Sequence, residues 1–241
     1  HYDAANERYR LTLKQTNASG GEAFYIPFAL GLLDAQGKDL ALSWRSGQQA
    51  GASGLLPFDQ AEQTFEFDHV KEKPLPSLLR DFSAPVKVQY DYSSEQLAFL
   101  LQHDSNDFNR WDAAQSLYSR MLLKLAADFR AGDELKVDQL ILQAMLAVVQ
   151  NDQLDNAVRA RLLQWPDIAY LAEQVQLIDI DALNAALRTA RRQAAQFLQT
   201  HCLQQYQRYS GKTALNGAAS ADRAWSNVCL AWLVASENNE F

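Results

Sequence analysis

Residues 86–101, with the sequence VKVQYDYSSEQLAFLL, contain the point at which the hydrophobic pattern of the chain changes. Apolar and polar residues alternate up to Tyr90, as in a strand that buries one face. From Leu97 onward, apolar residues return at steps of three and four, which indicates a helix. Between the two patterns, Ser93 and Gln96 have the spacing of a capping box, which satisfies backbone N–H groups at a helix start. The sequence therefore predicts strands before this point and helices after it.

The part before residue 86 repeats the alternating pattern. Further strands are predicted at residues 9–13, 26–32, 40–44 and 65–67. Asp34–Lys38 contains an aspartate and a glycine suited to reversing the chain between two of them. Ser46–Ser53 is rich in small polar residues and is predicted to be a mobile loop. Short strands at this spacing indicate an antiparallel, Ig-like β-sandwich.

The part after residue 93 has helical periodicity. Helices are predicted at about 107–129, 137–150, 155–164, 168–174, 180–209 and 221–235. Helices joined by short loops form a bundle or a solenoid, and the lack of a fixed sequence period favours an irregular array. The expected fold class is therefore α+β with two domains, a β-sandwich over residues 1–92 and an irregular α-helical array over residues 93–241.

The overall composition limits the function classes. The 241 residues are 48% hydrophobic, which is enough for one large core or two smaller ones. A net charge of −7 without a basic stripe argues against a nucleic-acid partner. Apolar runs of membrane-spanning length are missing, so we expect no membrane segment. Cys202 and Cys229 are expected to be buried free thiols, which favours a reducing compartment and hence the cytoplasm.

Residues typical of catalytic and metal sites form no convincing group. Each histidine is followed by a residue other than glutamate, and no two histidines lie four residues apart. A metal site would need three or four converging ligands, so none is expected. Carboxylates close in sequence, namely Glu62/Glu66, Asp104/Asp107 and Asp133/Glu134, are interpreted as solvated charges near turns and caps. His103 ends a predicted helix, where the helix dipole favours a cation.

Two further groups of charged residues have alternative interpretations. Asp107 and Arg110 are one turn apart on a predicted helix and could pair at its surface, with Trp111 in the core beside Asp112. The alternative is an interdomain role in which Trp111 packs on the β-sandwich. The basic cluster on the long helix, made of Arg188, Arg191 and Arg192, is interpreted as a solvated face.

Two segments resemble a known family. Leu78–Val88 (LLRDFSAPVKV) and Asn106–Gln115 (NDFNRWDAAQ) are similar to the junction between the β-domain and the helical domain of bacterial aminopeptidase N. That family, the gluzincin alanyl aminopeptidases, cleaves peptides with zinc held by His-Glu-x-x-His and a distal glutamate. It grips the substrate amine with a Gly-x-Met-Glu-Asn loop. Neither motif is present in this chain.

The resemblance implies a non-catalytic fragment of a zinc aminopeptidase that removes N-terminal amino acids. The β-sandwich would be a spacer after the catalytic domain, and the helices would be the first part of a HEAT-like, superhelical lid that restricts access to the active site. Zinc is expected in the parent enzyme and no cofactor in this chain. The domain junction is assigned by resemblance to six structural residues: Arg80, Asp81, Asp107, Arg110, Trp111 and Asp112.

The resemblance also implies partners. They are the catalytic domain of the same polypeptide and the peptide substrates of the parent. As an alternative to a solvated face, the arginine cluster would line the active-site chamber and favour acidic peptide ends. The chain is expected to begin after the first strand of the sandwich and to end before the full helical domain, so exposed apolar surface should favour self-association. A free-standing adaptor that binds a protein partner is the alternative function. A self-contained hydrolase that uses the acidic residues is a third hypothesis.

Overall fold

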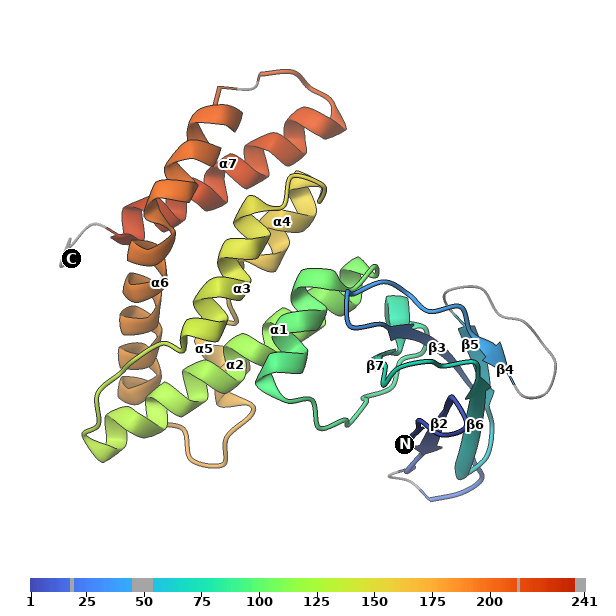
Figure 1. Cartoon of the computed structure of the whole chain (residues 1–241). Helices are drawn as coiled ribbons and strands as arrows, with labels where there is room; N and C mark the ends of the chain where they lie inside the picture. The colour runs from blue at the N-terminus through green and yellow to red at the C-terminus, as the bar shows by residue number, and fades with distance from the viewer. Residues whose placement is uncertain (18–19, 45–53, 212, 237–241) are drawn as a thin grey trace. The chain divides into compact units, whose positions relative to one another are not determined.

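The computed structural model describes residues 1–17, 20–44, 54–211 and 213–236 (Figure 1). The chain divides into two compact units, His1–Arg110 and Trp111–Phe241.

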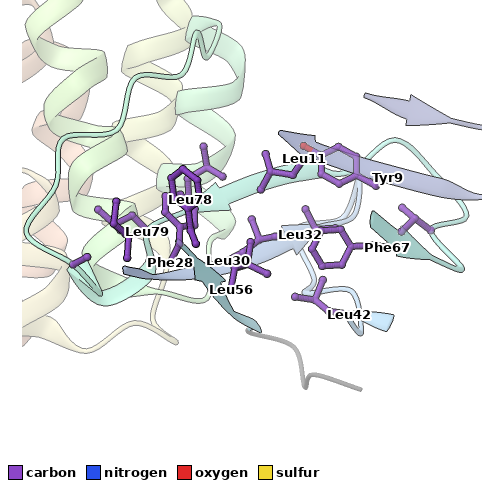
Figure 2. Packing of buried hydrophobic residues seen from close by; sticks show 14 residues of the cluster. Tyr9, Leu11, Phe28, Leu30, Leu32, Leu42, Leu56, Phe67, Leu78 and Leu79 are labelled. Atoms are coloured by element: carbon purple, nitrogen blue, oxygen red, sulfur yellow. The ribbon is translucent and has the colours of Figure 1, made fainter. Parts of the chain in front are cut away.

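The first unit contains two antiparallel β-sheets. One sheet has the order β1-β2-β6-β4, formed by β1 (Tyr2–Asp3), β2 (Arg8–Lys14), β6 (Glu62–Asp68) and β4 (Ser43–Trp44). The other has the order β5-β3-β7, formed by β5 (Gly54–Phe58), β3 (Ile26–Leu33) and β7 (Leu75–Leu78). Side chains of both sheets meet in one apolar core (Figure 2). The predicted β-sandwich is therefore confirmed.

The alternating pattern correctly assigns the buried faces of the main strands. Tyr9 and Leu11 of β2 and Phe28, Leu30 and Leu32 of β3 are buried in the core. The predicted reversal after β3 is also present: the Asp34 N–H donates to the Lys38 carbonyl at 2.9 Å, and Gly37 has a φ of 82°. Glycine suits this turn because other residues rarely adopt such a φ.

The pattern was less reliable for short strands. The predicted strand at Val86–Tyr90 is wrong, because this segment pairs with no strand among the described residues, although Val86 and Val88 pack on the core. The strand predicted at 40–44 is limited to β4. Strands β1, β5 and β7 were not predicted; β7 is buried over three successive residues and so shows no alternation. The predicted loop Ser46–Ser53 lies outside the described residues.

Every predicted helix is present. Helix α1 (Ser94–His103) lies in the first unit, and α2 (Asp107–Ala131) crosses from the first unit into the second. The second unit continues with α3 (Gln139–Gln150), α4 (Asn156–Leu162), α5 (Ile168–Ala172), α6 (Ile180–Tyr209) and α7 (Gly217–Ser236). The boundary proposed between residues 92 and 93 stays a prediction, since a compact unit and a domain of a family need not coincide.

Local capping explains where these helices begin. The capping box of α1 is formed, with Ser93 accepting from the Gln96 N–H and the Gln96 side chain accepting from the Ser93 N–H. Four aspartates cap α3, α4, α5 and α6 through side-chain oxygens that accept backbone N–H groups: Asp138, Asp155, Asp167 and Asp179. Such caps stabilise a helix by about 1 kcal/mol each. Within the described ranges, none of the helices is both long enough and apolar enough to cross a membrane.

Candidate functional site

The strongest concentration of buried charge lies in the first unit, where the chain leaves β7. Three residues in this turn, Leu79, Asp81 and Phe82, have φ values of 53°, 55° and 50°. The left-handed region costs non-glycine residues about 1–3 kcal/mol each. A hydrogen bond of 2.7 Å from the Asn106 side-chain amide to the Asp81 carboxylate helps to hold the turn. The unusual backbone directs Arg80 into the protein interior.

The Arg80 side chain is only 3% exposed, and its guanidinium donates four hydrogen bonds. It donates two hydrogen bonds to the Asp39 carboxylate, at 2.6 and 3.1 Å. A third hydrogen bond reaches Asp104 Oδ1 at 3.1 Å, and a fourth reaches Ser77 Oγ at 2.9 Å. One cation thus bridges two carboxylates that come from distant parts of the chain. We call Asp39, Ser77, Arg80, Asp104, Asn109 and Arg110 the Arg80 network.

The backbone of β3 leaves room for this side chain. At Gly31, a methyl group would lie 2.0 Å from Arg80 Cζ, far below van der Waals contact. Gly31 pairs with Ser77 of β7 in the sheet, so both neighbouring strands contribute to the Arg80 pocket. The φ of Gly31 is not in the left-handed region, so the backbone conformation does not require glycine here. The close approach of the Arg80 side chain requires it.

Asp104 follows the last residue of α1 and is completely buried. Burial raises the pKa of its carboxyl, while hydrogen bonds from Ser77 and the Asn106 N–H and the charge of Arg80 act in the opposite direction. Its Oδ2 atom has no hydrogen-bond partner among the described residues. The interpretation of Asp104 as a solvated charge is therefore wrong.

Arg110 caps the end of α1. Its side chain donates to the carbonyls of Asp104, Gln102 (3.0 Å) and Leu101 (3.5 Å), which belong to the last turn of α1 and its cap. These carbonyls lack partners within the helix, so the cation satisfies them and interacts favourably with the helix dipole. The predicted ion pair with Asp107 is wrong, since none joins these two side chains in the described part of the structure.

The same arrangement overturns the expectation for His103. The pKa of His103 is lowered, first by burial and second by the nearby charge of Arg110. The position at the C-terminus of α1 that favours a cation is already taken by Arg110. His103 instead packs against Phe99, with 4.6 Å between ring centroids, and against Gly37 of the turn after β3.

The structure distributes the six predicted junction residues unevenly. Arg80 and Arg110 lie in the Arg80 network, Asp81 binds Asn106 at its edge, and Asp107 is exposed. In the second unit, Asp112 is exposed and Trp111 is half-buried, with the Arg161 guanidinium 5.5 Å from its ring centroid. Their assignment to a domain junction, and the packing of Trp111 on the β-sandwich, stay predictions.

Sequence reasoning missed most of the Arg80 network. No local sequence pattern indicates Asp39 or Ser77 as a partner of Arg80. Asp39 in particular lies 41 residues from Arg80. Asn109, which donates to the Leu78 carbonyl at 2.8 Å and to Ser77 Oγ at 3.0 Å, was only part of a quoted segment. The two segments that resemble aminopeptidase N, Leu78–Val88 and Asn106–Gln115, do meet in this network. Their shared resemblance is the sequence signal that could have located it.

The chemistry of the Arg80 network is that of a structural joint. Its carboxylates accept hydrogen bonds from the Arg80 guanidinium and from a serine hydroxyl group, which fix their positions. No group of three histidine, cysteine or acidic side chains in the described ranges could hold a metal ion. The network ties together the segment after β3, the turn after β7 and the link between α1 and α2.

The second unit contains a similar buried arginine. Arg159 of α4 is completely buried and donates to the carbonyls of Val148 (3.3 Å) and Val149 near the end of α3. Its guanidinium lies 4.3 Å from the ring centroid of Trp225 in α7. Like Arg110, it satisfies the final carbonyls of the preceding helix. No local sequence pattern indicates this role.

Other candidates in the second unit are a pocket and a thiol pair. A pocket of about 890 Å³ is lined by residues that include Trp165, Pro166, Leu187, Arg191 and Trp232. Arg188, Arg191 and Arg192 of α6 are exposed, as both interpretations of this basic cluster require. Cys202 and Cys229 are buried free thiols, as predicted, and hydrogen-bond to each other between α6 and α7.

Comparison with known proteins identifies relatives along the whole chain. Residues 1–91 match the family described as a domain of unknown function (DUF3458) with an Ig-like fold, and residues 94–241 match that described as a domain of unknown function (DUF3458_C) with ARM repeats. Aminopeptidase N of Escherichia coli is 35% identical over 99% of this chain, and that of Haemophilus influenzae is 33% identical over 96%. The chain spans 28% and 27% of their respective lengths.

A solved structure extends the similarity to the fold. Legionella pneumophila aminopeptidase A in complex with aspartic acid has a TM-score of 0.80 and 27% identity to this chain. The match covers 98% of this chain and 27% of the Legionella chain.

Proposed function

Because the chain belongs to the DUF3458 and DUF3458_C family and is homologous to a part of bacterial aminopeptidase N, we propose that it is a non-catalytic region of a zinc aminopeptidase. The parent enzyme would remove N-terminal amino acids from peptides. The observation that carries the proposal is the match to aminopeptidase N over 99% of this chain but only 28% of the relative. The chain carries neither the His-Glu-x-x-His motif nor the Gly-x-Met-Glu-Asn motif, so the chemistry would reside elsewhere in the parent.

In this proposal, the first unit is a rigid spacer between the catalytic domain and the helices. The Arg80 network supports such a role, because it fastens α1 and the start of α2 to the β-sandwich through buried, charge-assisted hydrogen bonds. Such a rigid connection would hold α1 and the start of α2 in a fixed position on the β-sandwich, without a flexible linker. The partner that it positions would be the catalytic domain of the same polypeptide.

The second unit would form part of a lid that restricts peptide entry. Its exposed arginines, Arg188, Arg191 and Arg192, would face the chamber and favour peptides with acidic ends. Zinc would be bound by the parent outside the described residues, none of which form a fitting cluster. The free thiols of Cys202 and Cys229 support a cytoplasmic location.

The proposal is tested by comparing this chain with the complete reading frame that encodes it. We expect the complete product to bind zinc and to hydrolyse amino-acyl chromogenic substrates, whereas this chain alone should do neither. Metal analysis after dialysis and the activity assay measure both properties. One tightly bound zinc in this chain with chelator-sensitive turnover would contradict the proposal, and a reading frame without a zinc motif would favour the adaptor hypothesis.

The lid role has a separate test in the complete enzyme. Replacing Arg188, Arg191 and Arg192 together by alanine should raise the KM for peptides with acidic ends several-fold. The KM for single amino-acyl substrates should stay unchanged. Arg130→Ala, at an exposed position of α2, is the matched control and should change neither KM. An unchanged KM for acidic peptides in the triple variant would place the arginines outside the substrate path.

A further inference from the structure

The pocket of the second unit lies where three parts of the helical array meet. Its volume of about 890 Å³ falls within the range of small-molecule sites. The link between α4 and α5 and the start of α5 supply residues 163–169, and α6 supplies Leu187 and Arg191. The remaining lining residues come from α7 and are Asn227, Val228, Ala231 and Trp232. The pocket is therefore formed within one compact unit.

The walls of the pocket are mostly apolar and well packed. Leu163, Pro166 and Trp232 are buried. The ring of Trp165 packs against two other rings, with its centroid 5.7 Å from that of Tyr118 and 5.2 Å from that of Trp232. Aromatic pairs at such distances attract each other beyond the effect of their burial. These contacts hold the walls in place, so little ordering would oppose the binding of a ligand.

Arg191 is the one cation among the described residues that line the pocket. Its side chain is exposed, so it lies at the mouth of the pocket. Its guanidinium carbon lies 5.8 Å from the ring centroid of Trp232, and the guanidinium forms no ion pair with a described residue. The indole N–H of Trp165 is a buried donor without an acceptor in the described part of the chain. The lining therefore offers positive charge and hydrogen-bond donors to a ligand.

The acceptors of the link between α4 and α5 are already engaged. The Gln164 carbonyl accepts from the Gln115 side chain at 2.9 Å, and the Gln164 side-chain oxygen accepts from Arg161 at 3.2 Å. The carboxylate of Asp167, which also lines the pocket, caps α5 by accepting from the Tyr170 N–H at 2.8 Å. These groups leave the Arg191 guanidinium available for an anion.

We propose that this pocket binds a small organic acid with an aromatic or branched apolar body. The carboxylate would pair with Arg191, because a guanidinium binds a carboxylate through two parallel hydrogen bonds. The apolar body would pack against Trp165, Pro166 and Trp232. A cationic ligand is disfavoured, because Arg191 already lies beside the Trp232 ring. The inference goes beyond the proposed function and does not depend on it.

The C-terminus of a peptide carries the same carboxylate as a free organic acid. The peptide N–H groups beside that carboxylate would need acceptors, and those of Gln164 and Asp167 are engaged. A buried N–H group without an acceptor disfavours binding. The pocket therefore suits a free acid better than a peptide end.

Binding of 3-phenylpropionate and of 4-methylpentanoate to the 241-residue chain tests the proposal. The chain has five tryptophans, so the indole N–H signals in an NMR spectrum can be assigned by single substitutions, Trp165 by Trp165→Phe. Each acid should shift the Trp165 signal in a saturable manner and leave that of Trp44, in the first unit, unchanged. The neutral isostere 3-phenylpropionamide should bind about tenfold more weakly, because it lacks the charge that pairs with Arg191.

Substitution of the arginine separates charge pairing from apolar packing. Arg191→Gln should weaken the binding of 3-phenylpropionate about tenfold and bring it close to that of the amide. Arg130→Gln, which removes the same charge from an exposed position of α2, is the matched control and should bind like the wild type. An unchanged signal of Trp225, whose N–H donates to Gln205 of α6, would show that α6 and α7 remain packed in the variants.

Four outcomes would overturn the proposal. The first is the absence of a saturable Trp165 shift with both acids at millimolar concentration. The second is equal affinity for 3-phenylpropionate and its amide, which would show that the carboxylate is not recognised. The third is equal weakening by Arg191→Gln and Arg130→Gln, which would reduce the effect to the net charge of the chain. The fourth is tighter binding of glycyl-glycyl-phenylalanine than of 3-phenylpropionate, which would assign the pocket to peptide ends.

Discussion

Replacing Arg80 by methionine should strongly destabilise the first unit. The substitution keeps an apolar stem but removes the cation between Asp39 and Asp104, of which Asp104 is completely buried. Removing one partner of a buried ion pair costs about 3–5 kcal/mol, because the remaining charge is left without compensation. The exposed pair of Arg10 and Glu66 supplies the control: Arg10→Met should cost less than about 1 kcal/mol.

The pH dependence of the Arg80→Met variant follows from Asp104. Burial already raises the pKa of this carboxyl above its ordinary value of 3.8 in the folded chain. A carboxyl with a raised folded pKa stabilises the fold below 3.8, and this contribution is lost as the pH rises through the folded pKa. Without Arg80 the folded pKa should rise further. The difference in stability between wild type and variant should therefore narrow as the pH falls toward 3.8.

Amide hydrogen exchange of peptides from β3 and β7 measures this effect in the first unit alone, which matters because two units need not unfold together. A second variant, Arg80→Met with Asp104→Leu, removes the uncompensated charge and should recover part of the lost stability. Equal, small effects of Arg80→Met and Arg10→Met at neutral pH would refute the argument that the network holds the first unit together. A difference that does not narrow at low pH would refute the role of Asp104.

Five further substitutions test the packing and the capping of α1. Gly31→Ala should lower the free energy of unfolding by about 1–3 kcal/mol, because the added methyl group overpacks against Arg80. Gly217→Ala, at a position with open space, should leave the stability unchanged or raise it slightly. Equal denaturant midpoints for the two variants would contradict the close approach of Arg80 to Gly31. Trp225→Ala, at a completely buried position, should lower the free energy of unfolding by about 3–5 kcal/mol. Trp111→Ala should lower it clearly less, because the Trp111 side chain is half-buried. Chemical denaturation measures both effects. Arg110→Ala should cost about 1–3 kcal/mol by leaving carbonyls of α1 unsatisfied, and unchanged exchange of α1 amides would exclude the capping role.

The sequence by itself determined the elements that depend on local interactions. Helix α6 begins and ends at the predicted residues, because its cap at Asp179 and its apolar steps all lie within one or two turns. The capping box at Ser93 has the same local origin. Alternation likewise assigned the buried faces of β2 and β3, since each successive residue points to the opposite side of a strand.

Tertiary structure decided the pairing of strands and the partners of buried charges. Val86–Tyr90 alternates and packs on the core, yet it forms no ladder because a strand also needs a neighbour, which alternation does not supply. Arg110 could reach Asp107 one turn away, but folding placed unsatisfied carbonyls of α1 within its reach instead. Arg80 meets Asp39 and Asp104 across separations of 41 and 24 residues. Contacts at such separations leave no periodic trace in a sequence, because they exist only once the strands and helices have packed.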